Sequence, residues 1–217
     1  MHKIATLLLL PAFMSSAAHA IIADKSSRIG KGAYGAAIVG YSDSILQFNK
    51  EIVPKSGIVR EHLGSLDTGV GIGYMGSYKQ ILLGVEIVAG YAWGTKLDDD
   101  NQAGRKIDLR RGIFGEVVGK LGWKFNRTGV YALGGFTRTN FRVGTTDQDG
   151  GDIIQSGKFY QGPLFGAGIM YNLIDRLSPR FEYQHIRFVR AHLPVVTPGL
   201  SVKVRANIYH FALVYHL

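Results

Sequence analysis

The sequence contains no cysteine among its 217 residues. A disulfide framework, a thiolate metal site and a cysteine nucleophile are therefore excluded. Long apolar runs are scarce as well, because the most apolar segment after the first residues, ILLGVEIVAGYAWG (81–94), carries Glu86 near its middle. It is also shorter than the roughly 20 residues that a spanning helix needs. The sequence thus predicts neither a disulfide-stapled domain nor a helical membrane protein.

Residues 1–20 have the three regions of a secretory signal peptide. A basic start, MHK, precedes the apolar run IATLLLLPAFM and a stretch of small residues that ends in Ala18-His19-Ala20. This order predicts cleavage before Ile21, which leaves residues 21–217 as one exported domain. A transmembrane anchor is the alternative, but the run is too short to span a bilayer and Pro11 interrupts it.

The composition favours strands. Hydrophobic residues make up 46% of the chain, which is too many for a disordered protein, whereas 29 glycines and 11 tyrosines are unusual for a helical one. Strands joined by tight turns account for both features.

Turn residues divide the rest of the chain into segments in which apolar and polar residues alternate. There are eight: 33–42, 66–76, 79–93, 105–125, 128–143, 157–173, 176–190 and 202–217. The connections are alternately short (76–78, 126–127, 172–175) and long (43–65, 94–104, 144–156, 191–201). We therefore predict an all-β fold, an eight-stranded antiparallel up-and-down transmembrane β-barrel with short periplasmic turns and long external loops.

The two faces of the segments agree with this prediction. In the third segment, Ile81, Val85 and Ile87 share one face, and Glu86 lies on the other. A secreted β-sandwich or lipocalin-like barrel is the alternative, because alternation alone also fits a soluble protein. Aromatic residues near segment ends favour the membrane, where they would form two girdles: Tyr74, Tyr91, Trp93, Trp123, Phe125, Tyr131, Tyr171 and Tyr215.

The final segment, NIYHFALVYHL, is apolar on one face and would expose an unpaired edge if it stood alone. We expect it to close the barrel against the first segment, between Tyr34 and Tyr41, with its apolar face in lipid.

With these features the chain resembles the small outer-membrane β-barrel proteins of the opacity-protein and surface-antigen type, which share the OmpA/OmpX-like architecture. The resemblance is carried by ILLGVEIVAGY, VYALGGF, GPLFGAGIMYNL and LSPRFEYQHI. It implies a bacterial outer-membrane location and loops that meet host surface molecules. It further implies that the barrel-assembly machinery recognises a C-terminal signal, here Tyr209, Phe211, Leu213, Tyr215 and Leu217.

Charged residues on the polar faces predict an ion-pair network in the lumen. Eight strands leave an interior that side chains can fill, so a wide pore is not expected. Unpaired charges there would be costly, and we expect mutual compensation among Glu86, Arg110, Glu116, Lys120, Lys124, Arg180 and Glu182. The network either packs the lumen or acts as the gate of a narrow porin-like channel.

Basic residues gather near the external ends of the segments, in a chain of formal net charge +9. Arginine binds phosphate through paired hydrogen bonds, which suggests contacts with outer-membrane lipid and lipopolysaccharide. The candidates are Arg138, Arg142, Arg187, Arg190, Lys203 and Arg205. Nucleic acid is not an expected partner of an exported chain without a basic aromatic module.

The sequence offers no catalytic, cofactor-binding or metal-binding motif. His62, His185, His192, His210 and His216 form no metal-ligand spacing, and the loop DQDGGD (147–152) has an incomplete calcium pattern. We expect a non-enzymatic surface barrel with a structural, adhesion or host- and lipopolysaccharide-interaction role. A narrow gated channel and an enzyme that modifies lipid A are the alternatives.

Overall fold

The computed structural model describes residue 29 and the ranges 31–48, 60–94, 106–146, 152–188, 191–192 and 201–217. This part of the chain consists of strands and connecting turns, without a helix. The strands are β1 Lys31–Phe48, β2 Arg60–Tyr78, β3 Ile81–Gly94, β4 Lys106–Phe125, β5 Thr128–Thr146, β6 Asp152–Tyr171, β7 Leu177–Arg187, the short β8 Ala191–His192 and β9 Ser201–His216.

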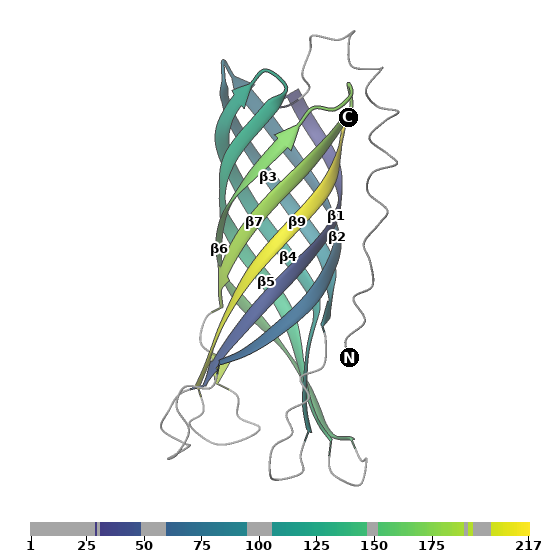
Figure 1. The fold of residues 1–217 in the computed structure, drawn as a ribbon, viewed down its shortest axis with the longest axis vertical. Coiled ribbons are helices and arrows are strands. Elements are labelled where there is room, and N and C mark those ends of the chain that lie inside the picture. The colour runs from purple at the N-terminus through teal and green to yellow at the C-terminus, as the bar shows by residue number, and fades with distance from the viewer. Residues whose placement is uncertain are drawn as a thin grey trace, which may run out of the picture.

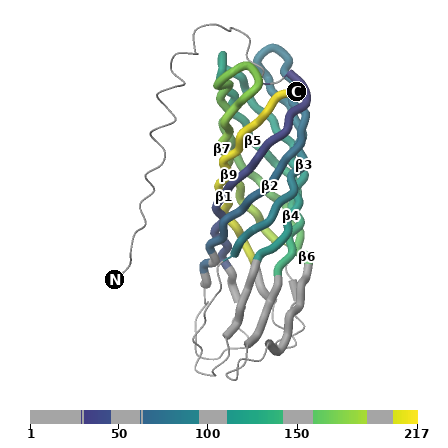
Figure 2. Tube along the Cα trace, turned by 90° about the vertical axis from the view of Figure 1, so that its right-hand side faces the viewer, coloured from purple at the N-terminus to yellow at the C-terminus, as the bar shows by residue number. Residues whose placement is uncertain are grey.

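Eight long antiparallel strands close into an up-and-down barrel (Figure 1). Each pairs with its neighbour in the chain, and β9 pairs with both β7 and β1, which completes the ring. Figure 2 shows the same tilted strands from the side, with β9 and β1 adjacent. The predicted fold class and the closure of the final segment against Tyr34 to Tyr41 are confirmed. Among the described residues, none belongs to a helix that is long and apolar enough to cross a membrane.

Tight turns join the strands at one end of the barrel, which we call the turn end. Lys79 and Gln80 link β2 to β3, Asn126 and Arg127 link β4 to β5, and residues 172–176 link β6 to β7. Lys79 and Asn126 take positive φ values of 56° and 52°, which lets the chain reverse within two residues. The turn expected at 76–78 was placed too early, because β2 continues to Tyr78.

At the opposite end of the barrel, which we call the loop end, β1 ends and β2 begins, as do β3 and β4 and then β5 and β6. The strands extend further toward it than the sequence indicated: β1 reaches Phe48 and β2 starts at Arg60, inside the connection expected over 43–65. Polar residues in these extensions masked the alternation. The calcium-like loop at 147–152 falls almost wholly outside the described residues, as does the predicted signal peptide at 1–20.

Inward and outward positions alternate along the long strands, with one interruption in β4 between Arg111 and Phe114. In β3 the residues from Leu82 to Ala92 at every second position face the lumen and are buried apart from Gly90, while their neighbours are exposed. The exposed set is strongly apolar and includes Val70, Ile72, Leu83, Val85, Ile87, Val117, Leu121, Phe136, Phe165 and Phe211. An apolar outer surface around a polar and aromatic lumen is the arrangement of a barrel in lipid.

Most of the aromatic residues expected in girdles point outward near strand ends, among them Tyr74, Trp93, Trp123 and Tyr215. Tyr131 is the exception and corrects that prediction. Its side chain faces the lumen and is 4% exposed. The parity of β5 explains this, because Tyr131 lies on the inward side together with Leu133 and Thr137.

Candidate functional site

Four charged side chains meet in the lumen and form what we call the lumen tetrad: Glu86, Lys120, Arg180 and Glu182. Arg180 donates two hydrogen bonds to Glu86, at 2.7 and 2.8 Å. Lys120 pairs with Glu86 and also with Glu182, whose Oε1 lies 2.7 Å from Nζ. Arg180 Nε lies 3.4 Å from the same oxygen. All four residues are at most 3% exposed, and their formal charges cancel.

Two inward tyrosines donate hydrogen bonds to the carboxylates of the tetrad. Tyr34 donates to Glu86 Oε2 at 2.9 Å, and Tyr131 donates to Glu182 Oε1 at 2.7 Å. Lys120 Nζ also lies 5.2 Å from the centre of the Tyr131 ring. Each carboxylate therefore accepts bonds from cations and from a phenol, which is how a buried charge is compensated.

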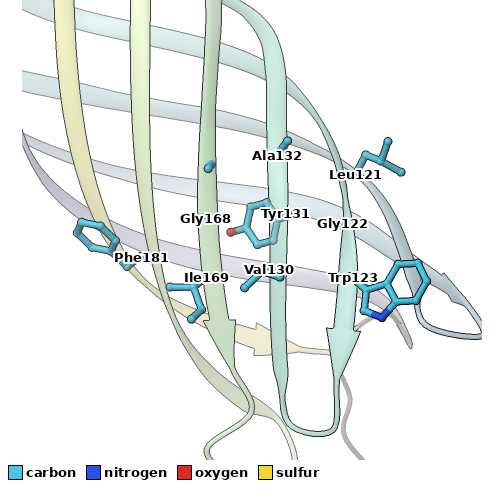
Figure 3. Close-up of a pocket in the computed structure, with 10 residues that line it drawn as sticks. Leu121, Gly122, Trp123, Val130, Tyr131, Ala132, Gly168, Ile169 and Phe181 are labelled. Carbon is cyan, nitrogen blue, oxygen red and sulfur yellow. The ribbon is translucent and has the colours of Figure 1, made fainter.

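Glycines make room for these rings. A Cβ at Gly73 would lie 2.5 Å from the Tyr34 ring, and one at Gly168 would lie 2.7 Å from that of Tyr131. In Figure 3 the Tyr131 ring extends toward Gly168, next to an outer hollow of about 580 Å³ lined by residues such as Trp123, Ile169 and Phe181. Side chains at either glycine would displace the tyrosines that hold the tetrad.

A second ion pair lies nearer the loop end and was missed by the sequence analysis. Arg111 Nη1 donates to Asp67 Oδ2 at 3.1 Å, and both side chains are fully buried. Ser42 and Ser65 donate to the other oxygen of Asp67, at 3.2 and 3.4 Å. Asp67 could have been found, since it shares the inward parity of β2 with Gly71 and Met75.

The Arg111 side chain escaped prediction because the β4–β5 register shifts between Arg111 and Phe114. The shift changes which parity faces inward, so Arg111 is buried although it is an odd-numbered residue of β4. Arg110 was chosen by extending the even parity of Glu116 and Lys120 across this point. It lies in β4 opposite Arg142, and its side chain is outside the described residues.

Two other predicted members of the network do not join the tetrad. Glu116 faces the lumen, but neither of its carboxylate oxygens has a hydrogen-bond partner. Lys124 lies at the turn end, where its Nζ donates to the carbonyl oxygen of Ile29 at 3.2 Å. The structure thus brings together four of the seven predicted residues.

A serine–histidine contact also lies at the turn end. Ser178 Oγ is 3.0 Å from His216 Nε2 and 3.2 Å from Asn172 Oδ1. Ser178 is fully buried and His216 is 4% exposed. A nucleophile needs access to its substrate, so we interpret this contact as packing of the turn end.

Among the basic residues, Arg187 and Arg205 lie directly opposite each other on β7 and β9. Both are exposed on the outer surface, as is Arg138 on β5, whose guanidinium lies 4.7 Å from the centre of the Phe159 ring. The side chains of Arg142 and Lys203 and the whole of Arg190 lie outside the described residues. The structure therefore juxtaposes one pair of the six candidates.

The residues of the predicted assembly signal share the outward face of β9. Tyr209, Phe211, Leu213, Tyr215 and Leu217 are between 43% and 73% exposed. The residues between them on β9 face the lumen and are buried. The backbone N–H of Leu217 donates a hydrogen bond to the carbonyl oxygen of Ala33 at 3.1 Å. Recognition of this face by the assembly machinery remains a prediction.

Comparison with known proteins agrees with the fold. The family model for an outer membrane protein beta-barrel domain matches residues 5–216. The 25 kDa outer-membrane immunogenic protein of Brucella ovis is 26% identical over 120 residues, which cover 55% of this chain and 54% of that protein. Its Brucella abortus counterpart is also 26% identical over 120 residues, with 51% of that protein covered. The chain spans about half the length of these curated relatives.

Two solved structures are similar as well. The outer membrane protein OprG from Pseudomonas aeruginosa aligns with a TM-score of 0.48 and 12% identity, covering 88% of this chain and 100% of that one. The attachment invasion locus protein Ail of Yersinia pestis aligns with a TM-score of 0.41 and 11% identity, covering 84% and 99%. Because the family model spans nearly the whole sequence, the chain belongs to the outer-membrane protein β-barrel domain family and is a protein of the bacterial outer membrane.

Proposed function

We propose that the protein is a structural and surface-interaction barrel that binds the phosphate groups of lipopolysaccharide through Arg187 and Arg205. The pairing of these two arginines is the observation that carries the proposal. Like charges directly opposite each other on neighbouring strands destabilise a sheet. Among the described side chains, neither arginine has a carboxylate partner. A phosphate between the two guanidinium groups would remove the repulsion through charge-assisted hydrogen bonds.

The residues on the turn-end side of the arginine pair support a lipid ligand. His185 lies opposite Asn207, and Tyr183 lies opposite Tyr209, on the same outer face of β7 and β9. Asn207 Oδ1 is 2.8 Å from His185 Nδ1 and accepts from the Tyr183 hydroxyl at 3.0 Å. The surface thus changes from aromatic to polar to cationic toward the loop end, which matches the order of acyl chain, sugar and phosphate in an outer-leaflet lipid.

We further propose that the external loops contact host molecules. The curated relatives are described as outer-membrane immunogenic proteins, which fits surfaces that reach the cell exterior. The lumen tetrad and the buried inward side chains around it support a barrel without a wide pore. A gated channel would instead give discrete conductance in planar bilayers, and a lipid-modifying enzyme would change the mass spectrum of lipid A.

Binding of lipopolysaccharide to the refolded barrel tests the proposal. Arg187→Gln with Arg205→Gln should weaken binding by roughly tenfold or more, because two hydrogen-bonded charge contacts are lost. Lys31→Gln with Lys79→Gln removes the same net charge from the turn end and should leave affinity unchanged. Enzymatic removal of the lipid phosphates should abolish the difference between the variants. Equal weakening by both double variants would reduce the effect to net charge and overturn the proposal.

A further inference from the structure

Glu116 is a buried carboxylate between the two ion-pair groups of the lumen, and Arg111, the cation that acts on it most, is already paired with Asp67. Beyond Lys124 at the turn end, the charged inward residues of β4 follow one another as Lys120, Glu116 and Arg111. Lys120 belongs to the lumen tetrad, and Arg111 is paired with Asp67. Glu116 is 2% exposed, and neither of its oxygens accepts a hydrogen bond.

The formal charges of this part of the lumen do not cancel. The tetrad holds two carboxylates and two cations, and Asp67 with Arg111 is neutral. Glu116 therefore leaves one negative charge among the described inward residues around it. An isolated carboxylate in an apolar interior costs far more than a barrel can sustain, so a positive charge has to accompany it.

Other polar atoms of the lumen are also buried without a partner. Thr137 lies opposite Glu116 in the register, and the Gln184 side chain lies beside the carboxylate. His210 projects from β9, opposite Glu182 of the tetrad. Thr137 Oγ1, Gln184 Oε1 and His210 Nε2 are all buried without a partner, and each of these residues is 2% exposed.

Three of these residues define what we call the Glu116 chamber: Glu116, Thr137 and Gln184. The unpartnered atoms of Glu116, Thr137 and Gln184 are oxygens that can accept hydrogen bonds. Nε and Nη2 of Arg111 are buried donors without a partner, but the single positive charge of Arg111 faces two carboxylates, Asp67 and Glu116. A carboxylate, an amide oxygen and a hydroxyl are the hard oxygen ligands that suit small cations and their water shells. Buried water alone could satisfy the acceptors but would leave the charge unbalanced.

We propose that the Glu116 chamber binds one small positive guest from the water phase, an alkali-metal ion or a proton, together with water. Glu116 is its charged ligand, and Gln184 and Thr137 provide neutral oxygens. The site lies on the loop-end side of the tetrad. It is distinct from the tetrad, because neither Lys120 nor Arg180 forms an ion pair with Glu116.

The charged and titratable groups around the chamber come from several strands. Arg111 lies on the same strand, Asp67 on β2, Glu182 on β7 and His210 on β9. In the register, β3 and β5 place the uncharged residues Val88 and Thr137 beside Glu116. A test must therefore isolate Glu116 from His210, which also titrates.

Urea unfolding of the protein in lipid vesicles provides the test. For an alkali-metal guest, the parent should become more stable as sodium replaces N-methylglucamine at constant ionic strength, by the linkage of binding to folding. For a proton guest, the folded state binds the proton more tightly, so the parent should gain stability as pH falls. Glu116→Gln should lose whichever dependence the parent has, and His210→Asn should retain it.

Asp43→Asn is the matched control, because it also removes one carboxylate, from the exposed contact with His62. It should respond to sodium and pH as the parent does. Infrared spectra separate the two guests: a carboxylic-acid carbonyl band that disappears in Glu116→Gln identifies the proton, and its absence together with sodium dependence identifies the metal ion. If parent and Glu116→Gln respond identically to sodium and to pH, the chamber binds no positive guest and the proposal is wrong.

Discussion

Single residues decide how charge is held inside this narrow barrel. Glu86 accepts hydrogen bonds from Lys120, from both terminal nitrogens of Arg180 and from Tyr34. Replacing one partner of a buried ion pair leaves the others uncompensated, which costs more than the pair contributes relative to an apolar core. Replacing all four residues of the tetrad by apolar residues should therefore cost less stability than replacing one of them.

Glu86→Gln should destabilise the folded barrel by about 3–5 kcal/mol, because Lys120 and Arg180 would then share Glu182 alone. Urea unfolding in vesicles measures this change. Asp43→Asn, at a site where the His62 and Asp43 side chains are 62% and 30% exposed, should cost less than about 1 kcal/mol. A Glu86→Gln barrel as stable as the parent would show that the tetrad does not stabilise the fold.

The sequence was informative about residues only where parity was uninterrupted. The four residues of the lumen tetrad could be assigned to the lumen because inward and outward positions alternate regularly around them. Arg111 could not, since the register shift in β4 leaves no mark in the residue pattern. The sequence also could not show that Glu116 lacks an ion pair of its own. Ion pairing across the lumen depends on the stagger between strands that are distant in sequence.

At the scale of the strand, β3 combines two tasks, one on each face. It packs lipid through Leu83, Val85 and Ile87, and it places Glu86 in the lumen from the intervening position. The period of two makes both possible and also made this strand the clearest element in the sequence. Its first residues were placed slightly early because Lys79 and Gln80, which form the turn, continue the alternation.

Charge on this outer face should be tolerated according to depth. Ile87→Arg, near the middle of β3, should cost about 2–4 kcal/mol, whereas Ile81→Arg, beside the turn, should cost about 0–1 kcal/mol. Both residues are exposed in the protein, at 57% and 43%, so loss of core packing cannot explain a difference. Equal costs in vesicle refolding would contradict the assignment of this surface to the bilayer.

At the scale of the whole molecule, closure of the ring gives every long strand a neighbour on each side for its backbone hydrogen bonds. β9 is central to it, since Tyr215 pairs with Gly35 of β1 on one side and with Leu177 of β7 on the other. A sheet with open edges would expose unpaired backbone groups to hydrocarbon. Alternating segments and tight turns predicted this closure without any knowledge of the strand stagger.

Deleting residues 214–217 should prevent folding even in detergent micelles. The deletion removes the partners of Tyr34, Gly35 and Ala36, together with the hydrogen bond from Leu217 to Ala33. Each backbone group left unpaired toward lipid costs several kcal/mol. Gel mobility before and after boiling measures the folded fraction, because a folded barrel resists SDS until heated.

Leu217→Ser is the control that separates closure from recognition. It keeps the backbone bond to Ala33 and changes a side chain that is 73% exposed, so refolding in micelles should match the parent. If the outward face of β9 is also the signal for assembly, the yield of this variant in the outer membrane of cells should fall while its refolding does not. A 214–217 deletion that reaches the outer membrane at the parental level would mean that the end of β9 neither closes the barrel nor directs its assembly.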